Sequence, residues 1–127
     1  DYTSIRELGA SLGSGGLVAL DETACVVAFA RRLIEYCAEE SCGTCPPCRI
    51  GSRVLLNLLD RILSGNGDAS DLDSIEGLCH HIRRTSLCEL GRNAPVAVIS
   101  GLRDFRDEYE AHIDGRGCPS GACSSVD

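Results

Sequence analysis

The chain has 127 residues, a formal net charge of −7 and 12 basic residues, all of them arginine. This length suits one domain, and the acidic balance argues against nucleic-acid binding, which needs clustered cationic side chains. No apolar run approaches the roughly 20 residues of a membrane-spanning helix, and the first residues do not resemble a signal peptide, so we expect no membrane insertion.

The first 20 residues are rich in glycine. Gly13, Gly15 and Gly16 precede a short apolar run at residues 17–20, and this order predicts a turn that leads into a short β segment. A phosphate-binding loop has the opposite order, with the strand before the glycines and a helix after them. We therefore favour turn chemistry over phosphate binding here.

Four amphipathic helices are predicted next. The first follows Asp21 as N-cap, the second begins near Cys48, the third follows Ser70 as N-cap, with Asp73 completing an approximate capping box, and the fourth has Pro95 at its first position. The first, second and fourth helices are expected to end near Glu39, at Ser64 and before Gly115. The predicted apolar faces are Val26, Phe29, Ala30, Leu33, Ile34 and Cys37; Val54, Leu55, Leu58, Leu59, Ile62 and Leu63; Leu72, Ile75, Leu78, Cys79 and Ile82; and Ile99, Leu102, Phe105, Tyr109 and Ile113.

These helices predict an all-α fold, a four-helix bundle over residues 21–115. The tail, residues 116–127, is too short to fold alone but holds two cysteines.

Cysteine is the most informative residue type in the chain. Nine cysteines occur beside three tyrosines and two phenylalanines. An odd number, with Cys42, Cys45 and Cys48 so close together, does not suit a secreted disulfide scaffold, in which an even number is usually spread over loops. We therefore expect a metal site in a reducing compartment, the cytoplasm, and keep a disulfide-bonded domain as the alternative.

The triplet at residues 42–48 (CGTCPPC) indicates an iron–sulfur cluster. A C-x2-C-x2-C run supplies three thiolates to one cubane, whose fourth iron takes a remote ligand. Zinc usually takes cysteines in pairs, so the triplet favours iron–sulfur over zinc. The best remote candidate is Cys88, in the predicted loop at residues 85–91.

Electrostatics supports this placement. Cys48 falls at a helix start and Cys88 about a turn before the next helix, and helix N-termini favour an anion such as a thiolate-bound cubane. Arg49 adds positive charge there, although solvation or ion pairing explains a surface arginine equally well. Four protein ligands leave no open position, so we expect single-electron transfer and assign no catalytic residue.

These motifs resemble a known family. Residues 40–51 (ESCGTCPPCRIG), 85–91 (TSLCELG), 94–95 and 100–113 resemble segments of the NADH-binding flavoprotein subunit of respiratory complex I and of its soluble NAD(P)-linked hydrogenase and formate dehydrogenase homologues. The glycines at 13–16 and Asp21 resemble the exit from that family's ubiquitin-like domain. The resemblance covers nearly the whole chain.

The resemblance implies a C-terminal helical domain with one [4Fe–4S] cluster on Cys42, Cys45, Cys48 and Cys88. Residues 1–20 would be the end of a preceding ubiquitin-like domain of the β-grasp type. FMN and NAD(P) are implied for the full-length protein, but their glycine-rich segment has no counterpart here, so no FMN or NAD contact is assigned. The implied partners are a thioredoxin-like [2Fe–2S] subunit and a larger multi-cluster iron–sulfur subunit.

The tail indicates which members of this family the chain resembles most. Residues 118–123 (CPSGAC) resemble the C-P-A-G-x-C ending of soluble relatives, chiefly multisubunit and electron-bifurcating hydrogenases. His112, Cys118 and Cys123 have the chemistry of zinc ligands, with Cys37 as the candidate fourth ligand and Cys79 in reserve. The alternative is a tail with two idle thiols.

The expected function is electron transfer within a soluble NAD(P)H-linked flavin oxidoreductase, with a hydrogenase assembly preferred. A β subunit of an NAD-dependent formate dehydrogenase and a structural zinc-binding interaction module remain alternatives. Cys25 and Cys79 are expected to be packing residues, because free cysteine is among the most buried residue types. His80 and His81 are expected to face solvent.

Overall fold

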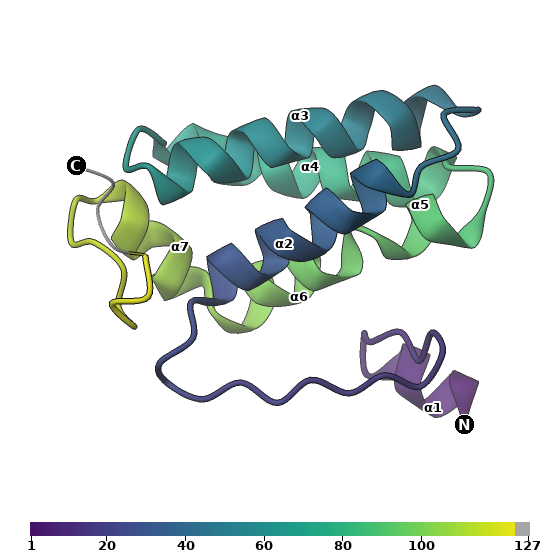
Figure 1. The fold of residues 1–127 in the computed structure, drawn as a ribbon, viewed down its shortest axis with the longest axis horizontal. Helices are drawn as coiled ribbons and strands as arrows, with labels where there is room; N and C mark the ends of the chain where they lie inside the picture. Colours follow the sequence, from purple (N-terminus) through teal and green to yellow (C-terminus); the bar gives the residue numbers. More distant parts are fainter. Residues whose placement is uncertain (124–127) are drawn as a thin grey trace.

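The computed structural model describes residues 1–123, which form seven helices and no β-strand. In chain order they are α1 (Tyr2–Glu7), α2 (Val26–Glu39), α3 (Pro46–Leu63), α4 (Ala69–Thr85), α5 (Glu89–Asn93), α6 (Val96–Asp104) and α7 (Arg106–Ile113). The last four residues of the predicted tail, 124–127, lie outside the described residues. Figure 1 shows α1 apart from the other helices, joined to α2 by an irregular connection. The all-α prediction is confirmed for the described part of the chain.

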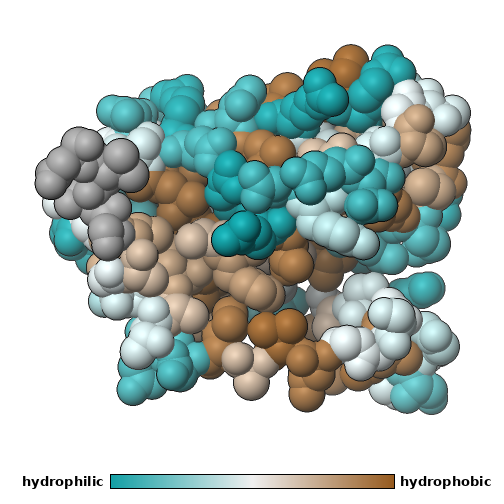
Figure 2. Space-filling model, viewed as in Figure 1, coloured by the Kyte–Doolittle hydropathy of each residue, from teal (hydrophilic) through white to brown (hydrophobic). Residues whose placement is uncertain are grey.

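The short β segment predicted at residues 17–20 is wrong. These residues adopt no regular structure, and Leu17 and Val18 are 94% and 64% exposed. A strand forms only where a neighbouring strand pairs with its backbone groups, and residues 1–123 provide none. Hydrophobic side chains lie along the lower edge of the molecule in Figure 2, below the helices, where Figure 1 draws this connection.

Helix α2 begins four residues later than predicted. The side chain of Asp21 accepts hydrogen bonds from the backbone N–H and the hydroxyl of Thr23, at 3.0 and 2.6 Å, and so closes a turn before the helix. Cys25 is the N-cap instead, and its sulfur accepts from the N–H of Ala28 at 3.4 Å. A thiol therefore lies at the first turn of α2.

The start of α4 is also displaced, by two residues. Asp68 is the N-cap, and Asp71 accepts from the N–H of Asp68 at 3.0 Å, which completes the capping box expected from Ser70 and Asp73. Ser70 donates its N–H to Asp68 at 2.7 Å. The prediction of a capping box is therefore confirmed, but with different residues, because aspartate is as good an N-cap residue as serine.

A single core joins α2, α3, α4, α6 and α7. Its fully buried members include three residues of α3 and three of α4 at the predicted helical spacing, namely Leu55, Leu59, Ile62, Ile75, Cys79 and Ile82. Helices α3 and α4 are in close contact at Gly51, where an added Cβ would lie 2.6 Å from Ile82 Cγ1. No helix within residues 1–123 is both long and apolar enough to cross a membrane.

The single helix predicted from Pro95 to Gly115 is broken at Phe105. There the backbone leaves the helical conformation (φ −135°, ψ 35°), so that α6 ends and α7 begins in a new direction. The break turns Tyr109 into the core, against Gly101, where an added Cβ would meet the tyrosine oxygen at 2.8 Å. Phe105, predicted to be buried, is 46% exposed.

Candidate metal centres

The cysteine triplet lies where the chain enters α3. Cys45 is the N-cap of α3 and Cys48 lies in its first turn; both are buried, whereas Cys42 is exposed in the preceding loop. Two prolines at the first helical positions fix this start without losing any intrahelical hydrogen bond. Gly43, with φ +76°, allows the tight turn between the first two thiols.

Hydrogen bonds to Cys42 and Cys45 favour the ionised form of these two thiols. The hydroxyl and the backbone N–H of Thr44 lower the pKa of Cys42. The backbone N–H groups of Leu87 and then of Cys48 lower the pKa of Cys45. The hydroxyl of Ser41 lies 3.3 Å from the sulfur of Cys48. Thiolates are the metal-binding form of cysteine, so the local backbone prepares these side chains for ligation.

The loop that carries Cys88 packs against the same end of α3. Leu87, whose backbone N–H contributes to the lowered pKa of Cys45, precedes Cys88 in the chain. Cys88 is the exposed N-cap of α5. Gly91 permits this approach, because an added Cβ would lie 3.1 Å from Cys48 Cβ and 2.6 Å from Ser86 Cβ. The structure therefore brings the triplet and the remote cysteine to one end of the bundle, on the right in Figure 1.

The groups around these four thiols suit a bound anionic cluster. Cys88 makes no side-chain capping bond at the start of α5. At the start of α3 the two prolines have no N–H and the N–H of Arg49 donates to the carbonyl of Cys45, so Cys48 supplies the one N–H group of the first turn without a helical partner. Arg49 folds back and donates to the carbonyl of Gly43, which holds its positive charge over the loop. The hydroxyl of Ser86 is buried beside Gly91 with no hydrogen-bond partner among the described residues. Four thiol donors with these neighbours fit a [4Fe–4S] cubane.

A second group of ligand atoms lies at the other end of α2. One ligand atom each from Cys25, His112, Cys118 and Cys123 lies within 4.8 Å of the other three. Three of these residues were predicted as zinc ligands. The fourth, Cys25, was expected to be a packing residue, and it takes the place predicted for Cys37.

Cys37 is excluded from this second group by the geometry of α2. It lies twelve residues after Cys25, which corresponds to about 18 Å along a helix axis. It is half-buried near the cysteine triplet, and burial followed by the nearby charge of Cys48 raises the pKa of its thiol. The reserve candidate, Cys79, is fully buried in the core between α3 and α4, as a packing residue should be.

The ring of His112 is oriented by the backbone of its own helix. Its Nδ1 lies 2.7 Å from the carbonyl oxygen of Glu108, one turn earlier in α7, and its Nε2 lies 3.7 Å from the sulfur of Cys25. The carboxylate of Glu108 accepts from the N–H of Val26 at 3.3 Å, which ties α7 to the start of α2. Glu108 thus has a local structural role.

The three thiols of this group have different acidities. Burial raises the pKa of Cys25. Burial acts in the same direction at Cys118, but hydrogen bonds from Ser120 and Cys123 outweigh it and lower the pKa to about 6. Burial, with interactions from Cys25 and Cys118, raises the pKa of Cys123 to about 12. The three thiols are therefore close enough to influence one another's ionisation.

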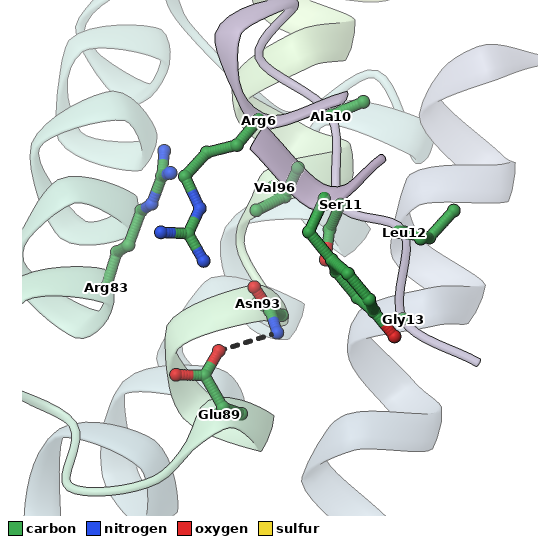
Figure 3. A pocket seen from close by; sticks show the side chains of 10 residues that line it. Arg6, Ala10, Ser11, Leu12, Gly13, Arg83, Glu89, Asn93 and Val96 are labelled. Atoms are coloured by element: carbon green, nitrogen blue, oxygen red, sulfur yellow. Dashed lines mark hydrogen bonds between the residues drawn. The ribbon is translucent and has the colours of Figure 1, made fainter. Parts of the chain in front are cut away.

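A cavity between α1 and the ends of α4 and α5 is separate from both thiol groups. Arg6, Arg83, Glu89 and Asn93 line it, and Figure 3 shows the Asn93 amide donating to the Glu89 carboxylate, at 3.1 Å. No cysteine or histidine lines this cavity. His80 and His81 lie outside it and are exposed, as predicted.

Fold and thiol placement together define a small all-helical domain of the iron–sulfur class. The sequence profile of the NADH-ubiquinone oxidoreductase-F iron-sulfur binding region matches residues 28–112, which include all four cysteines of the first group. The chain belongs to this family. The resemblance drawn from the motifs is therefore confirmed: this is an iron–sulfur domain of the type found in the NADH-binding flavoprotein subunit.

Three relatives illustrate the family. The chain is 41% identical to the NADP-reducing hydrogenase subunit HndC of Solidesulfovibrio fructosivorans over 126 residues, which cover 99% of this chain and 26% of that protein. It is 45% identical to the F subunit of NADH-quinone oxidoreductase from Streptomyces coelicolor over 119 residues, 94% of this chain and 26% of that protein. It is 41% identical to the F 2 subunit of NADH-quinone oxidoreductase from Rhizobium meliloti over 119 residues, which cover 94% of this chain and 28% of that protein. The chain thus spans about a quarter of the length of these relatives.

Proposed function

We propose that Cys42, Cys45, Cys48 and Cys88 bind one [4Fe–4S] cluster and that the domain transfers single electrons. The observation that carries this proposal is the close approach of Gly91, three residues after Cys88, to Cys48, because it places the remote loop against the triplet. Such a cluster supplies reversible one-electron chemistry without forming or breaking bonds to a substrate.

The chain's own residues would hold the cluster and tune its potential. The backbone N–H of Cys48 in the first turn of α3 and the guanidinium of Arg49 favour the added negative charge of the reduced form. The hydroxyl of Ser41 lies within hydrogen-bond distance of the Cys48 sulfur, and such bonds raise a cluster's reduction potential. Cys42 and Cys88 are exposed, so the cluster would sit near the surface, where a redox partner can approach.

For the whole protein we propose an NAD(P)H-linked flavin oxidoreductase of the cytoplasm, in which FMN is bound upstream of this chain. HndC is named as a subunit of an NADP-reducing hydrogenase, and the match to it takes in nearly every residue, tail included. This extent supports a hydrogenase assembly, bifurcating or not, and a β subunit of an NAD-dependent formate dehydrogenase is the alternative. A thioredoxin-like [2Fe–2S] subunit and a multi-cluster iron–sulfur subunit are the proposed partners.

The ligand assignment is tested by replacing one thiol of each kind. We expect Cys88→Ala to lose iron or to convert the cluster, because it removes the only remote ligand. Cys37→Ser is the matched control: it replaces a half-buried thiol near the triplet that is not a proposed ligand. Iron and sulfide content, the broad visible absorption bleached by dithionite, and the electron paramagnetic resonance of the reduced protein report the outcome. Equal iron in both variants would refute the assignment.

A further inference from the structure

We propose that Cys25, His112, Cys118 and Cys123 form a zinc site that fastens the tail to the start of α2 and the end of α7. This site is separate from the proposed iron–sulfur centre and does not depend on it. The residues come from three places in the fold: the N-cap of α2, the last turn of α7 and the segment after Gly117.

The distances suit tetrahedral coordination. Bond lengths of about 2.3 Å to sulfur and about 2.0 Å to nitrogen place neighbouring ligand atoms roughly 3.5–3.8 Å apart around a zinc ion. The four ligand atoms all lie within 4.8 Å of one another, and the Cys25 sulfur is 3.7 Å from His112 Nε2. A small inward movement of the tail thiols would therefore complete the shell.

The histidine is positioned for this role by an independent contact. Because a carbonyl oxygen can only accept, the 2.7 Å contact between Glu108 O and His112 Nδ1 places the ring proton on Nδ1. The lone pair of Nε2 then faces Cys25. Metal-binding histidines are commonly fixed through their second nitrogen in this manner. His112 is 4% exposed and Cys25 4% exposed, so two of the four ligands are held rigidly inside the fold.

Three sulfur atoms and one imidazole nitrogen form a donor set that selects zinc over oxygen-preferring cations. All four positions of a tetrahedron are filled by the chain, which leaves no place for water or substrate. Closed sites of this kind are structural. The role of the ion is therefore to fix residues 118–123 against the helices, where Cys118 and Cys123 already pack on the core.

The test is a two-metal comparison on the whole protein, reconstituted with iron, sulfide and zinc. Cys25→Ser removes one ligand yet keeps a good helix N-cap, and Cys37→Ser replaces the other thiol of α2. We expect about one zinc ion per chain in the parent protein. Cys25→Ser should lose nearly all zinc and keep its iron, Cys88→Ala should lose iron and keep zinc, and Cys37→Ser should keep both.

X-ray absorption at the zinc edge provides the structural readout, because iron does not interfere there. We expect three sulfur neighbours at about 2.3 Å and one nitrogen neighbour at about 2.0 Å. If Cys25→Ser fails to fold, as judged by circular dichroism, Cys123→Ser makes the same test from the tail. A parent protein without zinc, zinc retained in both serine variants, or a disulfide between Cys118 and Cys123 would overturn the proposal.

Discussion

The cysteines of this chain differ in reactivity because their surroundings differ. Cys79 is fully buried, and burial, with a smaller contribution from Glu76, raises the pKa of its thiol to about 12. Cys42 differs from Cys79 in both respects, because it is exposed and hydrogen bonds from Thr44 lower its pKa. A thiol that is neither ionised nor accessible is chemically inert, so Cys79 contributes to packing alone.

We predict that Cys79 escapes alkylation by iodoacetamide in the native protein. At about pH 8 only about one part in ten thousand of a thiol with this pKa is ionised, and the side chain is inaccessible. Unfolding in guanidinium chloride should make it reactive, and mass spectrometry of the peptides locates the label. Native-state labelling of Cys79 as fast as in the unfolded protein would contradict this expectation.

How closely two helices can pack depends on the size of the residues where they touch, and glycine permits the closest contact. Helix α3 meets α4 at Gly51, directly against the buried Ile82. Because Ile82 is enclosed by the core, it has little freedom to move aside for an added methyl group. The α3–α4 pair in turn supports both the triplet, at the start of α3, and the loop that follows α4.

We predict that Gly51→Ala destabilises the domain by about 1–3 kcal/mol, since overpacking a close helix contact costs about this much. Gly77→Ala is the matched control: it also lies in a helix, but an added Cβ would meet nothing within 4 Å. It should stabilise the domain by about 0.5–1 kcal/mol through helix propensity. Thermal unfolding of the two variants should therefore shift in opposite directions, and parallel shifts would disprove the packing argument.

In the whole molecule, the two thiol groups occupy the two ends of α2. The proposed cluster lies where α2 leads into α3, and the proposed zinc site lies at the N-cap of α2, beside α7. A ligand that binds only the folded state stabilises that state by mass action. Zinc bound at the tail should therefore stabilise the helices that supply its ligands.

We predict that added zinc raises the midpoint of thermal unfolding of the parent protein and leaves that of Cys25→Ser unchanged. With free zinc at about 100 times the dissociation constant, the gain is about 2.7 kcal/mol. This corresponds to several degrees for a domain of this size. Differential scanning calorimetry checks it, with magnesium as the control cation. An equal rise in both proteins would indicate binding elsewhere.

Short sequence patterns predicted those features of the fold that depend on neighbouring residues, namely helices and motifs. The helical spacing of Leu55, Leu59 and Ile62 identified α3 and its buried face, and the motif around Cys42 identified the family. The break at Phe105 was missed because the apolar spacing continues through it. The turn at Phe105 places Tyr109 against Gly101, a tertiary contact that the apolar spacing does not reveal.

The proposed zinc ligands could not all be predicted from the sequence. Cys25 and His112 are 87 residues apart, and no spacing rule connects them. Cys37 was preferred because it precedes the triplet closely in the sequence, whereas tertiary packing selects the thiol at the opposite end of the same helix. The one local feature that could have drawn attention to Cys25 is its position as the N-cap of α2. Because Asp21 was predicted to be the N-cap, this feature was missed.

The number of residues in α2 determines how the two thiol groups are placed relative to each other. Its 14 residues separate Cys25 from the loop of Cys42 by about 21 Å of rigid rod. One inserted residue would rotate everything beyond it by about 100° and advance it by about 1.5 Å. Either Cys25 would leave the tail thiols or the triplet would leave the loop of Cys88, so this helix should tolerate substitutions on its exposed side but no change in its number of residues.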